Sequence, residues 1–271
     1  MGILPEKIYD WPNWRRTHGE PQNRRQLFQC VLTDQFFSMI PVNLLYLLFW
    51  LPAALWSALC VFQVLAAVQA NDGTAAVGTI NSWMLGLIPC ITVTGPGKAG
   101  MALLMRNWAA EEYTPVLSTF RKGLRENWKQ TLLPSFLTGL LPMAIWSTYQ
   151  MCAGGSMLLL WIVCAVAALF LMAMQIYYVL LVTYALRPIQ HFRNAVLLLF
   201  MKLPVFLLVF IGSLTFVILA AVFAALFPDA GWLDLLLPMV YYSTVGLAVT
   251  ALIRASFANW LREKYLSPEE S

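Results

Sequence analysis

Acidic residues are scarce in this chain, and none lies in the middle of a long apolar stretch. Asp and Glu together account for 13 of the 271 residues. Those nearest the apolar stretches fall at their ends or between them: Asp34, Asp72, Glu111, Glu112, Glu126, Asp229 and Asp234. A proton- or cation-coupled transporter usually keeps a carboxylate near the middle of the membrane. The absence of one argues against that class of transporter.

Recognisable catalytic and metal-binding motifs are also missing. The chain has no HExxH, GxSxG or GxxxxGK[ST] sequence, which excludes the common zinc proteases, serine hydrolases and P-loop NTPases. Its two histidines, His18 and His191, are isolated. The five cysteines stand singly, without the paired spacing of a disulfide or metal framework: Cys30, Cys60, Cys90, Cys152 and Cys164. We therefore expect no enzymatic activity, no cofactor and no metal.

Apolar sequence is what the chain has in abundance. Hydrophobic residues make up 60% of it and charged residues 11%, which is more apolar surface than one soluble core can hide. A helix needs about 20 apolar residues to cross a bilayer, and long continuous runs indicate helices rather than barrel strands. About six spans are predicted, near residues 36–69, 80–105, 131–151, 156–185, 203–227 and 232–257.

These patterns predict an all-α fold, a polytopic transmembrane helical bundle over residues 36–257. An irregular interfacial arm precedes it at 1–35, where prolines interrupt any helical period, and a tail follows at 258–271. The 17 Lys and Arg residues fall before the first span, between the second and third, between the fourth and fifth, and at the end of the sixth. Because positively charged loops stay inside, both termini are expected to be cytoplasmic. We interpret the basic charge as contact with anionic lipid headgroups, not with nucleic acid.

The polar stretch between the second and third spans predicts a cytoplasmic amphipathic helix. After Pro115, apolar and aromatic residues recur near helical spacing as far as Trp128. The basic residues of this region form a candidate surface for lipid or for a partner: Arg106, Arg121, Lys122, Arg125 and Lys129. An ABC-transporter subunit or another membrane subunit is such a partner, and a homo-oligomer is a further alternative.

Gly95-Pro96-Gly97 interrupts the second span and allows two interpretations. In the first, the span ends here and Lys98 extends to the headgroups. In the second, a discontinuous helix restarts at Gly97 and presents its free N–H groups, together with Lys98, to an anion. Asn43, in the first span, is most simply an interhelical hydrogen-bonding residue. The candidate ligand or pore residues are Asn43, Thr94, Gly95, Gly97, Lys98, Gln175 and Tyr241.

Three motifs together point to a family. They are Asn43-Leu44-Leu45 with Leu51-Pro52, Pro89 with Thr94-Gly95-Pro96 and Ala99, and Phe120-Arg121 with Glu126-Asn127-Trp128-Lys129-Gln130. Over roughly residues 36–210 the chain resembles the YesL-like family of bacterial membrane proteins, a domain of unknown function. It departs from the family pattern in the loop 71–79 and at Lys98. The resemblance implies a bacterial plasma-membrane protein, often encoded beside sugar-uptake ABC transporters, with no catalytic residues to carry over.

Two functions are predicted as alternatives. The first is a non-enzymatic accessory or scaffold subunit of a membrane assembly, linked to carbohydrate uptake and contacting its partner through Arg106–Lys129. The second is a small-solute or anion transporter or channel that uses the Gly95–Lys98 helix break.

Overall fold

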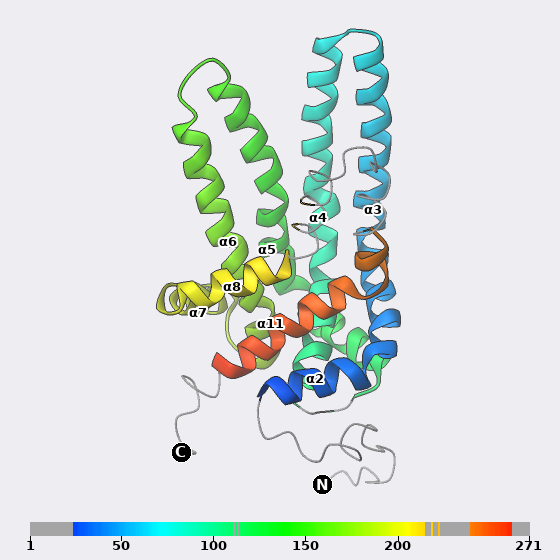
Figure 1. Cartoon of the computed structure of the whole chain (residues 1–271), viewed down its shortest axis with the longest axis vertical. Coiled ribbons are helices and arrows are strands. Elements are labelled where there is room, and N and C mark those ends of the chain that lie inside the picture. The colour runs from blue at the N-terminus through cyan, green and yellow to red at the C-terminus, as the bar shows by residue number, and fades with distance from the viewer. Residues whose placement is uncertain are drawn as a thin grey trace.

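Two long helical hairpins dominate the molecule. The computed structural model describes residues 24–110, 112, 114–214, 218, 222 and 239–261. The first hairpin is α3 (Phe36–Gln69) with α4 (Gly73–Ala109), and the second is α5 (Val116–Cys152) with α6 (Leu158–Thr183). In Figure 1 both tight turns lie at the upper end, and the shorter helices gather around the lower halves of the hairpins. These shorter elements are α2 (Arg24–Asp34), α7 (Pro188–Met201), α8 (Leu203–Ser213), the π-helical turn η2 (Tyr242–Gly246) and α11 (Leu247–Leu261).

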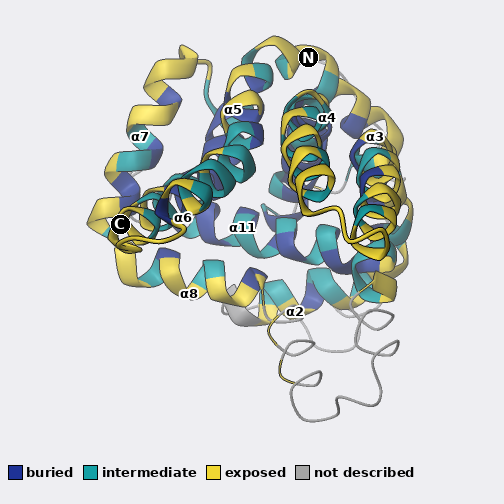
Figure 2. Ribbon diagram, turned by 90° about the horizontal axis from the view of Figure 1, so that it is seen from above, coloured by how far each residue is buried: buried dark blue, intermediate teal, exposed yellow. Residues whose placement is uncertain are grey.

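The predicted transmembrane helical fold is confirmed. Helices α3, α4, α5 and α6 and the segment Met239–Leu261 are long and apolar enough to cross a membrane, and the bent pair α7–α8 raises the total from 5 to 6. On α3 a ridge of leucines is exposed to the surroundings: Leu44, Leu48, Leu51, Leu55 and Leu59. Figure 2 shows the same outward exposure along the outer faces of the long helices. Such a surface suits lipid, since a soluble protein of this size rarely exposes so continuous an apolar face.

Two predicted segments need correction. The arm was expected to be irregular, but residues 24–34 form α2, because the prolines of the arm all precede this stretch. The predicted fifth span starts as α8, which has only 11 residues and bends by 101° from α7. The rest of that span, much of the start of the sixth, residues 1–23 of the arm and residues 262–271 of the tail lie outside the described residues.

The predicted amphipathic helix and third span are one continuous helix. Helix α5 begins after Pro115, as expected, but runs for 37 residues through Pro134 and Pro142. A proline in a helix leaves the carbonyl four residues earlier without its N–H partner. For Pro134 that carbonyl is Gln130, and the hydroxyl of Tyr177 on α6 donates to it at 3.1 Å. The neighbouring helix therefore compensates the missing bond, as transmembrane prolines require.

Helix α4 also continues through Gly95-Pro96-Gly97, so both interpretations of this stretch as the end or restart of a helix are wrong. The glycines serve close packing instead. A Cβ atom at Gly95 would lie 2.6 Å from Oγ of Ser135 and 2.8 Å from the carbonyl oxygen of Thr131, both on α5. One at Gly97 would lie 2.8 Å from the ring of Phe49 on α3. Small residues let transmembrane helices approach in this way.

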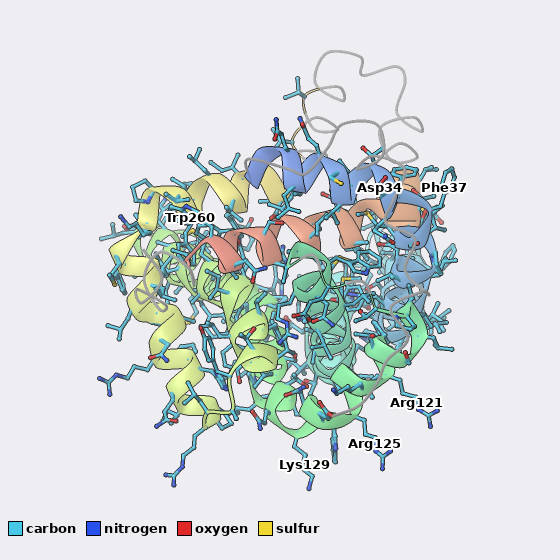
Figure 3. The ribbon with its side chains drawn as sticks, turned by 90° about the horizontal axis from the view of Figure 1, so that it is seen from below. Asp34, Phe37, Arg121, Arg125, Lys129 and Trp260 are labelled. Atoms are coloured by element: carbon cyan, nitrogen blue, oxygen red, sulfur yellow. The ribbon has the colours of Figure 1, made fainter. Side chains whose placement is uncertain are left out.

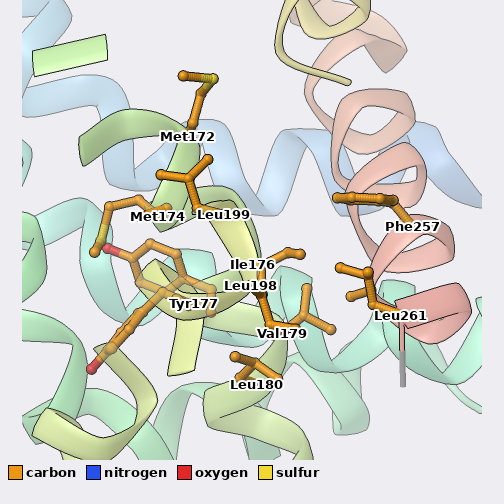
Figure 4. Close-up of a cluster of buried hydrophobic side chains, with 14 of the residues drawn as sticks. Met172, Met174, Ile176, Tyr177, Val179, Leu180, Leu198, Leu199, Phe257 and Leu261 are labelled. Carbon is orange, nitrogen blue, oxygen red and sulfur yellow. The ribbon is translucent and has the colours of Figure 1, made fainter. Parts of the chain in front are cut away.

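Helix α11 joins the two halves of the core. Its residues Ala248, Leu252 and Ala255 pack with α3 and α4. Its residues Phe257, Ala258 and Leu261 pack with α6, α7 and α8. Figure 4 shows Phe257 and Leu261 approaching the buried side chains of α6 in this second cluster. Every residue of α11 is buried or partly buried, so its fully buried polar groups must find their partners inside the protein.

Candidate functional site

Two basic side chains come from helices that pack against each other inside the bundle. Lys98 belongs to α4 and Arg254 to α11, and the positive charge of Arg254 disfavours a second positive charge on Lys98. Both residues are partly buried, and the Nε atom of Arg254 is buried without a hydrogen-bond partner. No carboxylate of the described chain offsets either charge. The pair is therefore a concentration of uncompensated positive charge within two apolar helices.

Aromatic hydroxyl residues surround the pair. The Nζ atom of Lys98 lies 5.5 Å from the ring centre of Tyr178 on α6, a cation–π distance. The hydroxyl of Tyr178 lies 2.9 Å from Oγ of Ser135 on α5. Tyr46 and Tyr242 come from α3 and η2, which both pack against α11, the helix of Arg254. Six segments of the chain thus contribute to this region, which offers two cations and several hydroxyl groups.

Asn43 fixes the segment that precedes Arg254. Its Nδ2 atom donates to the carbonyl oxygens of Tyr242 and Ser243, each at 2.8 Å. Its Oδ1 atom accepts from the backbone N–H of Ala248 at 3.0 Å. A π turn departs from the regular α-helical bonding pattern, and one amide side chain here bonds to three backbone groups of that region. The interpretation of Asn43 as an interhelical hydrogen-bonding residue is confirmed, and its donors are occupied.

The other candidate ligand residues make contacts of several kinds. The hydroxyl of Thr94 donates to the carbonyl oxygen of Ile91 in its own helix at 2.7 Å, and Gly95 and Gly97 contact α5 and α3. Tyr241 packs edge-on against Tyr242, with ring centres 5.2 Å apart. Gln175 is buried on α6 with both polar amide atoms lacking partners. Lys98 is thus the candidate that the structure brings to the cation pair.

Sequence reasoning missed Arg254 and the tyrosines around it. Arg254 was counted among cytoplasmic charges at the end of the last span. The signal was nonetheless there, because the chain stays apolar beyond it, through Phe257, Trp260 and Leu261. An arginine followed by nearly two more apolar helical turns is more consistent with an interior position than with a helix end.

The predicted basic surface divides into two parts. Arg106 faces inward: its Nη1 atom donates to the carbonyl oxygen of Val182 at 2.9 Å, and its Nη2 atom to Oδ1 of Asn107 at 2.6 Å. It thereby satisfies a carbonyl at the C-terminal end of α6, where positive charge is favourable. The exposed part comprises Arg121, Lys122, Arg125 and Lys129 of α5. Figure 3 shows Arg121, Arg125 and Lys129 directed away from the bundle.

At the opposite end of the first hairpin, Asp72 has a structural role. Its carboxylate accepts from the N–H of Ala75 at 2.9 Å and from the hydroxyl of Thr74 at 2.7 Å, which caps α4. These hydrogen bonds, the Ala75 bond foremost, lower the pKa of Asp72. No group of three or more potential metal ligands occurs in the described part of the chain. Comparison with protein-family models, with curated proteins and with solved structures gives no match.

Proposed function

We propose that this protein is a membrane transporter or channel for a small anion, which it binds between Lys98 and Arg254. The observation that carries the proposal is a pair of cations on two packed helices, α4 and α11, with Lys98 against the Tyr178 ring and the Nε atom of Arg254 buried without a hydrogen-bond partner. Charge held in a low-dielectric interior is costly unless it is paired. An anion between the two side chains would relieve both the desolvation and the repulsion.

The neighbouring groups define the chemical class of the anion. Two cations and nearby tyrosine hydroxyls suit a compact carboxylate or phosphate group, which accepts several hydrogen bonds at once. The site lies between α3, α4, α6 and α11, so binding involves side chains from packed helices and needs no helix break. The proposal places the protein in a bacterial plasma membrane with both termini cytoplasmic, and the distribution of Lys and Arg supports that orientation.

Ligand-dependent thermal stability tests this function. The full chain, in nanodiscs of phosphatidylcholine, which has no net charge, would be heated with inorganic phosphate, sulfate, acetate and gluconate, each at equal ionic strength. At 100 times its Kd an anion stabilises the folded state by about 2.7 kcal/mol. Lys98→Met and Arg254→Met should abolish that gain, whereas Arg193→Gln, on the exposed side of α7, should retain it. The proposal would be refuted if both methionine variants were stabilised by anions as much as the native protein. It would also be refuted if none of the four anions stabilised the native protein.

An accessory subunit of a membrane assembly is the second candidate function. It is supported by the exposed basic face of α5, formed by Arg121, Lys122, Arg125 and Lys129. The link to carbohydrate uptake rests on the resemblance to the YesL-like family alone. Affinity purification in mild detergent, from cells growing on complex glycans, should then recover a stoichiometric partner. Recovery of the protein alone would count against this candidate.

A further inference from the structure

An apolar groove runs along the outside of α5, next to α3 and α4. Its volume is about 570 Å³, and its walls include Phe49, Val93 and Trp128. Val93 is 48% exposed and Trp128 is 45% exposed, so the groove opens outward and not into the core. Since α3, α4 and α5 are all candidate membrane spans, the groove faces the lipid phase. Its occupant in a membrane must therefore be largely apolar.

One end of this groove is strongly basic. Arg121 and Arg125 belong to its lining. The same two residues also line an adjoining open pocket of about 930 Å³, together with Lys122 and Glu126. An apolar compartment and a cationic compartment therefore meet at two arginines. Residues four apart on a helix lie on one face, and Figure 3 shows both side chains projecting from the same side of the molecule.

We propose that this groove is a binding site for one anionic phospholipid. An acyl chain lies along Phe49, Val93 and Trp128, and the headgroup phosphate lies between Arg121 and Arg125. Arginine suits this task because its planar guanidinium forms paired hydrogen bonds with phosphate oxygens. A soluble anion would make no favourable contact with the apolar part of the groove. The positively charged choline of a zwitterionic lipid would be repelled by the basic part.

The site is separate from the Lys98–Arg254 pair, and none of its lining residues contacts that pair through a recorded interaction. It goes beyond general attraction of basic residues to the membrane, because it assigns one lipid to one groove. A basic residue near a charged membrane surface typically contributes about 1 kcal/mol, which is roughly a five-fold preference. Two arginines then predict a preference of roughly 25-fold for anionic lipid.

Native mass spectrometry of the full chain tests the proposal. The protein would be released from micelles containing equal amounts of dioleoylphosphatidylglycerol and dioleoylphosphatidylcholine, and the lipid retained would be counted. We expect one retained phosphatidylglycerol and little phosphatidylcholine. Arg121→Gln combined with Arg125→Gln should remove the preference, while Arg193→Gln, which removes one positive charge outside the groove, should keep it.

A second variant separates the groove from the charge. Val93→Trp fills the apolar part while leaving both arginines in place, and its outward position spares the core. It should reduce retention of both lipids. Equal retention of the two lipids by the native protein would overturn the proposal. The proposal would also fail if Arg193→Gln lost as much of the lipid preference as the double variant. It would fail too if the double variant kept the native preference, and the basic face would then be better explained as a surface for a protein partner.

Discussion

The hydroxyl of Tyr177 donates a hydrogen bond to the backbone carbonyl oxygen of Gln130 at 3.1 Å. Gln130 lies four residues before Pro134, which has no N–H to donate to it. The bond thus joins α6 to α5 at the point where the helix itself cannot supply a partner. It explains how one helix can include both the basic surface segment and an apolar span.

Removing this hydroxyl should destabilise the protein. Tyr177→Phe leaves the Gln130 carbonyl without a donor, which typically costs about 1–3 kcal/mol. Chemical unfolding in detergent, followed by circular dichroism, measures the change. Tyr184→Phe is the control, because no hydrogen bond of the Tyr184 hydroxyl is recorded. Pro134→Ala restores a backbone N–H for the Gln130 carbonyl, so Tyr177→Phe should lower the free energy of unfolding less in that background. An equal loss in both backgrounds would mean that the Tyr177 hydroxyl does not compensate for Pro134.

Asn43 should be essential for stability to a degree unusual for one amide. Asn43→Leu keeps the size of the side chain but removes three hydrogen bonds to the Tyr242–Ala248 region. At about 0.6 kcal/mol for each such bond in a membrane protein, the loss is roughly 2 kcal/mol. Asn43→Asp retains the acceptor but loses both donors, so it should be no better than leucine. A stable aspartate variant would contradict the assignment of the donors.

Gly95 should not tolerate even a methyl group. In Gly95→Ala the new Cβ would lie 2.8 Å from the Thr131 carbonyl oxygen, and such overpacking costs about 1–3 kcal/mol. Gly78→Ala, in the same helix, has no atom within 4 Å of the new Cβ, so it should be neutral or stabilising by up to about 1 kcal/mol. Thermal unfolding of the two variants decides the matter. Equal effects would mean that α4 and α5 are farther apart than the structure shows.

Relief of repulsion should make one site variant more stable than the native protein when no anion is present. Lys98→Met removes one of two like charges and retains an unbranched side chain of similar length. We expect a higher unfolding temperature in chloride-free buffer, and the difference should narrow as a binding anion is added. A lower unfolding temperature of Lys98→Met under all conditions would show that the charge of Lys98 is already compensated when no anion is bound.

The cap at the turn between α3 and α4 should respond to acid. The pKa of Asp72 is lowered in the folded state, so its stabilising contribution is present above the unfolded pKa and is lost as the pH falls through the folded pKa. The difference in unfolding temperature between the native protein and Asp72→Asn should therefore be largest near neutral pH and shrink in strong acid. If the difference in unfolding temperature stayed constant from neutral pH to strong acid, the ionised carboxylate of Asp72 would not be the source of the stabilisation.

Sequence patterns predicted the helices well because apolar length depends on local composition. The first predicted span, 36–69, coincides with α3. Prolines and glycines were harder to interpret, since their effect depends on the neighbouring helix. Gly95 was interpreted as part of an interruption, yet α4 is continuous there and packs closely against α5. The position of Arg254 depended on packing across α3, α4 and α11, which no local pattern contains.

The π-helical turn Tyr242–Gly246 also changes how the end of the chain should be projected onto a helical wheel. A π turn amounts to one extra residue in an α-helix, and each residue of an α-helix advances the side-chain direction by about 100°. A wheel drawn without interruption from Met239 to Leu261 therefore misdirects one end relative to the other by about that angle. Residues on either side of Gly246 need separate wheels, and on the second of these Arg254 points about 100° away from Ala255 and within about 40° of Ala258 and Leu261.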